Sequence, residues 1–272
     1  MAEENTFPQP PELTETVFAA LDDKAKLPGA AMVVLGILAG VYIGFGGLVA
    51  TVALAGANSL PYGAAQLMAG VAFSVGLALV LIAGAELFTG NTLMAGSIAT
   101  GRLPVRVVLR ALCIVYIANF LGSILLAAAA FLAGLQEAGD GAVGRAALEL
   151  AAAKLDKSFA TAFASGVLAN MLVCLAVWMA YAGKSVTDKI VGLVMPITAF
   201  VAAGLEHSVA NMYLLPYAFF VQAAAADVTP SVAFTGIAGN LVPATLGNIL
   251  GGSLVAGAYG YVNGRPKHSE AE

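Results

Sequence analysis

Two short polar segments interrupt otherwise apolar stretches of this chain. They are GAELFTGN at residues 84–91 and GLEHSVAN at residues 204–211. A Gly, a Glu and an Asn recur in both segments at a spacing of 120 positions. An ionisable residue in the middle of a bilayer costs about 3 kcal/mol on insertion scales, so it usually marks a transport pathway or a buried pair. Two such sites at matching places in two halves predict a membrane pore or carrier with paired broken helices.

His207 is the strongest candidate for chemistry within these segments. Because an unperturbed imidazole titrates near pH ~6.5, it can exchange a proton with a small anion or hydrogen-bond to it. The alternative is a core histidine satisfied by its neighbours. Glu206 is adjacent, but consecutive helical positions point about 100° apart, so we expect Glu206 to hold the broken backbone. Thr89 could place a hydroxyl beside the histidine, or satisfy backbone groups that the break exposes.

Five further residues could belong to a pathway or to packing. Asn170 and Asn248 lie within the fourth and sixth apolar stretches, where either could hydrogen-bond between helices or contact substrate. Lys154 precedes the fourth stretch, and it could be a snorkelling anchor or a cation that attracts anions to a pore. Phe73 and Phe200 precede the two polar segments. They could be core aromatics or form a hydrophobic constriction.

The composition identifies the protein class that must position these residues. Hydrophobic residues make up 60% of the 272 residues, charged residues 10%, and the mean hydropathy is +0.90. Such a chain is a polytopic membrane protein. Six apolar stretches reach the ~20 residues that a helix needs to cross a bilayer: 29–55, 64–97, 105–134, 158–182, 190–221 and 233–262. The second and fifth exceed one span and contain the polar segments, which predicts helices broken at membrane depth.

Charge distribution predicts the topology. Nine Lys and Arg residues flank one side of the predicted spans and three flank the other, which favours cytoplasmic termini. Residues 1–28 are acidic at the start and proline-rich, unlike a signal peptide, and 14–27 could form an amphipathic interfacial helix. We therefore expect a cytoplasmic segment at 1–28, a transmembrane pore domain at 29–262 and a cytoplasmic tail at 263–272.

The two halves of the chain also resemble each other outside the polar segments. GILAG at 36–40 resembles GVLAN at 166–170, and NFLGS at 119–123 resembles NILGG at 248–252. Three spans per half is an odd number, so the second half must be inverted in the membrane. The sequence therefore predicts an all-α protein of six transmembrane helices, arranged as two inverted three-helix repeats with the second and fifth helices broken.

Several classes of function are disfavoured. The chain has no Walker A, GxSxG or HExxH motif, and Cys113 and Cys174 are too far apart in sequence for a zinc or redox motif. We expect no cofactor and no metal. A membrane enzyme built on His207 and Glu206 would need a further catalytic group, and the other histidine, His268, is in the tail. A water channel would carry Asn-Pro-Ala motifs, which this sequence lacks.

Four segments together resemble the formate/nitrite transporter family: ELFTGN (86–91), ANMLVCLAVWMAYAGKS (169–185), GLEHSVANM (204–212) and LVPATLGN (241–248). The resemblance implies a homopentamer of aquaporin-like protomers, each with its own pore, in a bacterial inner membrane. Members pass small monovalent anions of weak acids, with protons as the second transported species and no nucleic acid partner. Formate is the expected substrate, and YAGKSVTDK (181–189) favours that branch. Nitrite, hydrosulfide, acetate and lactate are the alternatives.

The resemblance also implies roles for individual residues. His207 would be the central pore histidine, Thr89 the facing hydroxyl and Lys154 the vestibule lysine. Polar residues supporting the histidine would be Asn170, Glu206 and Asn248. One constriction would consist of Phe73 and Phe200, and the other of Leu77, Phe88 and Val173.

Overall fold

The computed structural model describes residues 7–224 and 232–263, and the regular elements in these ranges are helices. Five helices are long and apolar enough to cross a membrane: α2 (Gly29–Leu54), α3 (Tyr62–Ala83), α6 (Val105–Leu132), α8 (Phe159–Ala182) and α11 (Phe234–Asn263). The remaining span is divided between α9 (Val186–Ala202) and α10 (Ser208–Ala224). Shorter helices are α1 (Pro10–Ala25), α4 (Phe88–Asn91), α5 (Ala95–Ala99) and α7 (Ala142–Leu155), with 3-10 turns η1 (Ala57–Ser59), η2 (Thr92–Met94) and η3 (Leu135–Glu137). The prediction of six spans with breaks in the second and fifth is confirmed.

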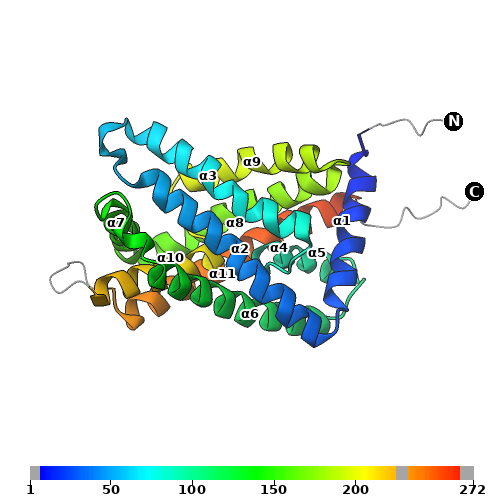
Figure 1. Ribbon diagram of the computed structural model, residues 1–272. Helices are drawn as coiled ribbons and strands as arrows, with labels where there is room; N and C mark the ends of the chain where they lie inside the picture. Colours follow the sequence, from blue (N-terminus) through cyan, green and yellow to red (C-terminus); the bar gives the residue numbers. More distant parts are fainter. Residues whose placement is uncertain (1–6, 225–231, 264–272) are drawn as a thin grey trace, which may run out of the picture.

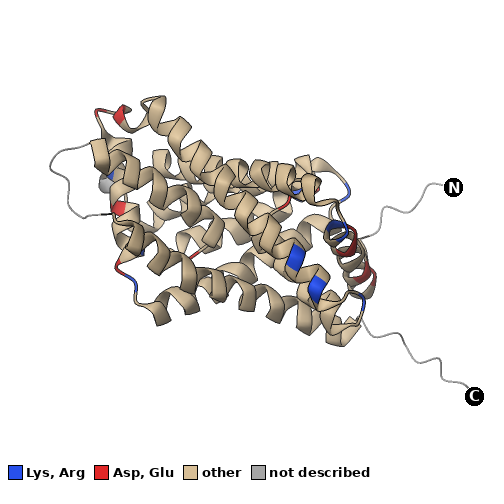
Figure 2. Cartoon of the chain, turned by 90° about the horizontal axis from the view of Figure 1, so that it is seen from below, with Lys and Arg blue, Asp and Glu red and all other residues tan. Residues whose placement is uncertain are grey.

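The long helices pack side by side, with α1 at one end of the bundle and α7 at the opposite end (Figure 1). Charged residues gather mostly toward these two ends and leave long uncharged middles (Figure 2). This distribution is the one that a bilayer requires, because lipid tails cannot solvate charge. The termini of the described chain, in α1 and at the end of α11, lie at the same end.

Each broken span turns at a glycine. Gly84 ends α3 with φ of 73°, and Gly204 follows α9 with φ of 63°. These left-handed conformations favour glycine because it has no Cβ. The residue after each glycine donates its backbone N–H to a carbonyl in the last turn of the preceding helix. Ala85 donates to Val80 at 2.9 Å, and Leu205 donates to Phe200 at 3.2 Å. The matching geometry supports the assignment of two repeats.

An asparagine from a neighbouring span secures each break. Asn119 on α6 accepts the N–H of Phe88 at 2.8 Å, and Asn248 on α11 accepts the N–H of Ser208 at 2.8 Å. The side-chain amides also donate to paired carbonyls: Asn119 to Gly36 and Glu86, and Asn248 to Gly166 and Glu206. Backbone groups that a broken helix leaves unpaired are thus satisfied inside the protein, as a bilayer demands.

The spans within each repeat approach closely through glycine. A Cβ at Gly122 on α6 would collide with the carbonyl oxygen of Ile37 on α2. A Cβ at Gly247 on α11 would collide with the carbonyl oxygen of Phe163 on α8. Because both obstacles are backbone atoms, neither can rotate away, and the helices would have to separate.

Substituting Gly122 by alanine is therefore expected to destabilise the protein by about 1–3 kcal/mol through overpacking. The matched control is Gly257→Ala, on α11, where an added Cβ meets no atom within 4 Å. Thermal unfolding of the purified protein in detergent measures both. Equal midpoints for the two variants would contradict the proposed role of close helix approach.

The N-terminal helix packs on the transmembrane bundle. Its apolar residues Val17, Phe18 and Leu21, which the interfacial helix expected at 14–27 would turn toward lipid, are buried in the protein. The Phe18 ring meets Trp178 edge-on, with centroids 6.1 Å apart. Arg102, before α6, holds α1 through ion pairs of 2.7 Å to both Asp22 and Glu15. Residues 1–6 and 264–272, at the outer ends of the two segments expected in the cytoplasm, lie outside the described residues.

Candidate functional site

A cavity of about 710 Å³ lies at the α7 end of the bundle. It brings together residues that are far apart in sequence, including Phe73, Lys154, Lys157, Phe200, Glu206 and His207. Five of the predicted site residues therefore share one space: an imidazole, a carboxylate, an ammonium group and two aromatic rings. We call this the large cavity.

His207 joins the two broken spans. Its Nε2 lies 2.9 Å from the Thr89 hydroxyl, and both side chains are buried. Its Nδ1 accepts the backbone N–H of Ala210 at 3.0 Å, which caps the first turn of α10. Because Nδ1 is occupied as an acceptor, the neutral ring carries its proton on Nε2. His207 therefore donates to Thr89, whose own hydroxyl proton remains available for another acceptor.

Aromatic rings surround the histidine. Phe73 and Phe200 meet edge-on with centroids 5.4 Å apart, and Phe200 lies 5.7 Å from the His207 ring. Both phenylalanines are buried and line the large cavity. An ion leaving the cavity past these rings would lose its water without a charged replacement, which is costly. The arrangement fits the predicted hydrophobic constriction.

Glu206 is fully buried and is the centre of a charged cluster. Its Oε1 lies 2.6 Å from Lys157 Nζ, and Lys154 Nζ is 3.4 Å from both carboxylate oxygens. Oε2 also accepts hydrogen bonds from Asn211 and Asn240. Burial lowers the pKa of the Lys154 ammonium, as does the charge of Lys157, while Glu206 acts against them. Lys154 therefore loses its charge at a lower pH than an exposed lysine.

The first repeat contains a counterpart of this cluster at the α1 end. Glu86 pairs with Lys24 at 2.7 Å and accepts the Asn91 amide at 2.8 Å. Lys24 precedes Lys154 by 130 positions, as Gly36 precedes its counterpart in the second repeat. The helix α1 thus occupies in the first repeat the place that α7 occupies in the second.

A second, smaller cavity of about 20 Å³ lies nearer α1. Leu77, predicted at the second constriction, lines it together with Leu87 and Val177. None of the described residues lines both cavities, so the two cavities are separate. Val173 is buried one turn before Val177 on α8 but does not line this cavity.

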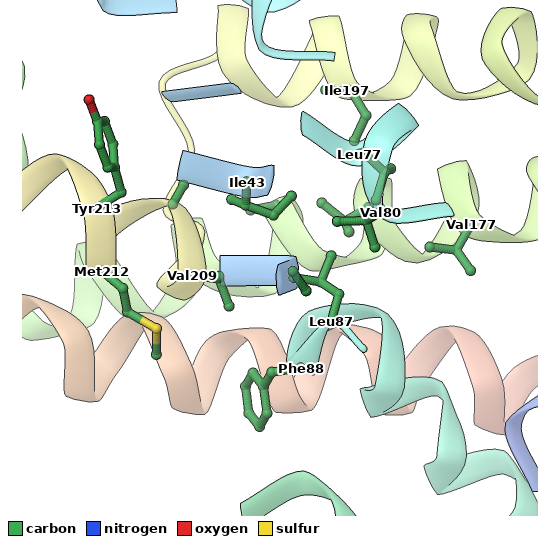
Figure 3. Packing of buried hydrophobic residues seen from close by; sticks show 14 of the residues in the cluster. Ile43, Leu77, Val80, Leu87, Phe88, Val177, Ile197, Val209, Met212 and Tyr213 are labelled. Atoms are coloured by element: carbon green, nitrogen blue, oxygen red, sulfur yellow. The ribbon is translucent and has the colours of Figure 1, made fainter. Parts of the chain in front are cut away.

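Phe88 does not occupy its predicted position at this constriction. Its ring packs against Tyr116 with centroids 4.8 Å apart. Figure 3 shows Leu87 pointing toward Leu77 and Val80, whereas Phe88 points the opposite way. The physical reason is that adjacent residues at the start of a helix diverge by about 100°. Leu87, and not Phe88, therefore lines the smaller cavity with Leu77.

Asn170 and Asn248 act as hydrogen-bond donors between helices. The Asn170 amide donates to the Thr89 carbonyl, the Thr92 hydroxyl and the Asn248 carbonyl, at 3.2, 2.9 and 2.6 Å. Neither asparagine lines a cavity described above. The sequence left two roles open for these asparagines, hydrogen bonding between helices and contact with substrate. Their contacts fit hydrogen bonding between helices.

Sequence reasoning missed several residues that the structure brings into the site. Asn119 lay within one of the repeated segments, and its match to Asn248 was the available signal. Lys24 and Lys157 were counted only among the Lys and Arg residues beside the predicted spans, from which the topology was predicted. The spacing of 130 positions could have revealed Lys24 as the partner of Lys154 in the repeat. No local sequence pattern marks Lys157 or Asn240 as a residue of the site.

Comparison with known proteins agrees with this geometry. The family model described as formate/nitrite transporter matches residues 11–262. This chain belongs to the formate/nitrite transporter family. A probable formate transporter of Methanothermobacter thermautotrophicus is 40% identical over 275 residues, covering 94% of this chain and 97% of the relative. The formate channel FocA of Escherichia coli K12 is 35% identical, covering 82% of each.

Solved structures of the formate/nitrite transporter family share the fold. One, titled a pentameric formate channel with formate bound, has a TM-score of 0.80 and 36% identity, covering 86% of this chain and 96% of that chain. An FNT family ion channel has a TM-score of 0.80 and 30% identity, covering 93% and 99%. As a member of this family, the chain is an integral membrane protein that transports anions. Its relatives are channels and transporters, which confirms the prediction that the protein is not an enzyme.

Proposed function

We propose that this protein is a passive channel for formate in which a proton accompanies the anion. The observation that carries the proposal is the contact between His207 Nε2 and the Thr89 hydroxyl, at the junction of the two broken spans. Lys154 in the same cavity supplies positive charge for attracting the anion. The similarity to a channel solved with formate bound supports formate as the substrate.

His207 acts in this proposal as a hydrogen-bond donor. Its Nδ1 is held by the Ala210 N–H, so loss of the Nε2 proton would leave an imidazolate, which is too basic for a working intermediate. The ring could accept a second proton only after releasing Ala210. The Nε2–H instead polarises the Thr89 hydroxyl, which donates to a formate oxygen. The hydrogen-bonded pair thus presents a donor beside the large cavity, which His207 lines.

The proton travels with the substrate. Lys154 makes a nearby acid easier to deprotonate, so formate is an anion where it first binds. Deeper in, Phe73 and Phe200 exclude water, and desolvation raises the pKa of a carboxylic acid from its solution value near ~4. Formate therefore passes Phe73 and Phe200 as the neutral acid, with its proton drawn from the outer solution through the water of the cavity.

We further propose that the protein lies in a bacterial inner membrane. The Lys and Arg distribution supports an orientation with the α1 end and both termini in the cytoplasm, so the large cavity would face outward. Lipid-facing and partner-facing sides are apolar, with many large exposed hydrophobic residues along α2, α3, α6 and α11. The similarity to a pentameric channel supports a homopentamer. Native mass spectrometry of the protein in detergent tests this assembly.

Uptake of labelled formate into proteoliposomes, measured across external pH, tests the function. We expect flux that rises as the external pH falls, with alkalinisation outside the vesicles as protons enter. Nitrite, hydrosulfide, acetate and lactate serve as competitors. Displacement of formate by nitrite at a far lower concentration would assign the protein to nitrite, and pH-independent flux would exclude the neutral-acid route.

Replacing Lys154 by alanine is expected to raise the KM for external formate roughly tenfold, because the cavity loses the positive charge that concentrates the anion. The maximal flux should change little, since saturating formate fills the cavity without electrostatic help. Initial uptake rates over a range of formate concentrations separate the two parameters. An equal loss at saturating formate would contradict a role limited to attraction.

A further inference from the structure

Lys157 is the closest cationic partner of the buried Glu206. It lies between α7 and α8, and its Nζ is 2.6 Å from Glu206 Oε1. The same ammonium group donates to the carbonyl of Gly204 at 2.7 Å. Lys157 therefore binds both the carboxylate and a backbone carbonyl that the break between α9 and α10 leaves without a helical partner.

Lys154 is held more loosely by the same carboxylate. Its Nζ is 3.4 Å from each Glu206 oxygen, whereas a charge-assisted hydrogen bond of this kind normally measures about 2.7–2.9 Å. The second oxygen of Glu206, Oε2, accepts hydrogen bonds from the amides of Asn211 and Asn240. Three close donors thus occupy three of the roughly four acceptor positions of the carboxylate, and Lys154 is not one of them.

The charged side chains that meet around Glu206 carry a positive balance. Lys154, Lys157 and Glu206, here called the mouth cluster, carry two positive charges and one negative charge. Glu149 also lines the large cavity, but it is exposed, so solvent and salt screen its charge. The positive excess of the mouth cluster faces a cavity that the proposed function fills with an anion.

We infer that Lys157 is a positioning residue that neutralises Glu206 and thereby leaves the Lys154 ammonium to bind the incoming anion. The inference rests on the proposed function. Without Lys157, Lys154 would move into a close pair with Glu206, and the mouth cluster would become neutral. Two lysines are needed because a single lysine would form a close ion pair with Glu206 and would not remain available to bind the anion.

The test is formate uptake by proteoliposomes containing Lys157→Gln. We expect the external KM to rise about fivefold, as loss of one partly screened charge implies, with the maximal flux nearly unchanged. Lys157→Arg should retain the original KM because it keeps the ion pair. The matched control is Arg145→Gln, which removes the same charge from α7 at an exposed position outside the cavity lining.

A compensating variant separates this role from support of the loop. Glu206→Gln combined with Lys157→Gln restores one net positive charge and keeps acceptors for Asn211 and Asn240, so the KM should return to within about twofold of the original. If Lys157→Gln fails to assemble, Lys157→Met supplies a neutral variant that retains the aliphatic stem.

Two results would overturn the inference while leaving the proposed function intact. One is an unchanged KM in the neutral Lys157 variants. The other is a loss of maximal flux that the double variant does not recover, since this would mean that Lys157 merely holds the loop. Absence of weak-acid anion flux in the unaltered protein would overturn the proposed function and this inference with it.

Discussion

Replacing His207 with phenylalanine is expected to reduce formate flux at least ~100-fold, because a preorganised donor in a dry site is worth several kcal/mol. The Thr89 hydroxyl would lose its partner, and the large cavity would end in a third aromatic ring beside Phe73 and Phe200. Uptake into proteoliposomes measures the loss, and size-exclusion chromatography checks that the assembly is intact. Unchanged, pH-dependent uptake would contradict a central role for the histidine.

A second variant distinguishes hydrogen-bond donation from proton relay. Asparagine at position 207 can cap α10 by accepting the Ala210 N–H and can still donate an N–H toward Thr89. It cannot accept a proton at neutral pH. We expect His207→Asn to retain flux within roughly tenfold of the original. Loss as complete as that of His207→Phe would mean that the imidazole itself transfers the proton.

The largest expected loss of stability follows from replacing Asn248 with leucine. Three buried backbone groups would lose their partner: the N–H of Ser208 and the carbonyls of Gly166 and Glu206. Each unsatisfied group costs about 1–3 kcal/mol, and bonds between helices in membranes tend toward the lower value. We expect a total loss of about 3 kcal/mol and a lower thermal unfolding midpoint.

The repeat offers a matched comparison for this experiment. Asn119→Leu removes the equivalent three bonds at the first break and should destabilise the protein to a similar degree. Leu246→Ala, on the same helix as Asn248 but exposed on the surface of the described chain, is the control and should change little. A midpoint for Asn248→Leu equal to that of the control would show that the asparagine is not needed to hold the break.

Most of the architecture could be predicted from the sequence because a bilayer imposes strong rules on helix length and charge. The stretch at 29–55 became α2, and that at 105–134 became α6, within two residues at each end. The break near Glu206 was also visible, since charged and amide residues at membrane depth are rare enough to stand out.

A site residue could be predicted from the sequence when its own side-chain chemistry suggested its role. A residue whose role depends on a partner elsewhere in the chain was harder to predict. His207 could be chosen because no other described histidine exists within the spans. Phe88 was misplaced because sequence does not indicate which face of a broken helix a residue occupies. Lys157 could not be distinguished from an ordinary flanking lysine, because its role depends on Glu206, 49 positions away in the sequence.

The two ends of the pore differ in charge: Glu86 has one lysine partner among the described residues, whereas Glu206 has two. A passive pathway cannot accumulate solute, so at equal pH the ratio of maximal rate to KM must be the same in both directions. A lower KM at the α7 end therefore goes with a proportionally lower maximal rate from that side than from the α1 end. A variant that raises the KM at the α7 end without changing the maximal rate must lower the ratio of maximal rate to KM from the α1 end by the same factor. Lys157 would then set the concentration range over which each direction saturates, while the equilibrium distribution of formate stays fixed by the pH difference across the membrane.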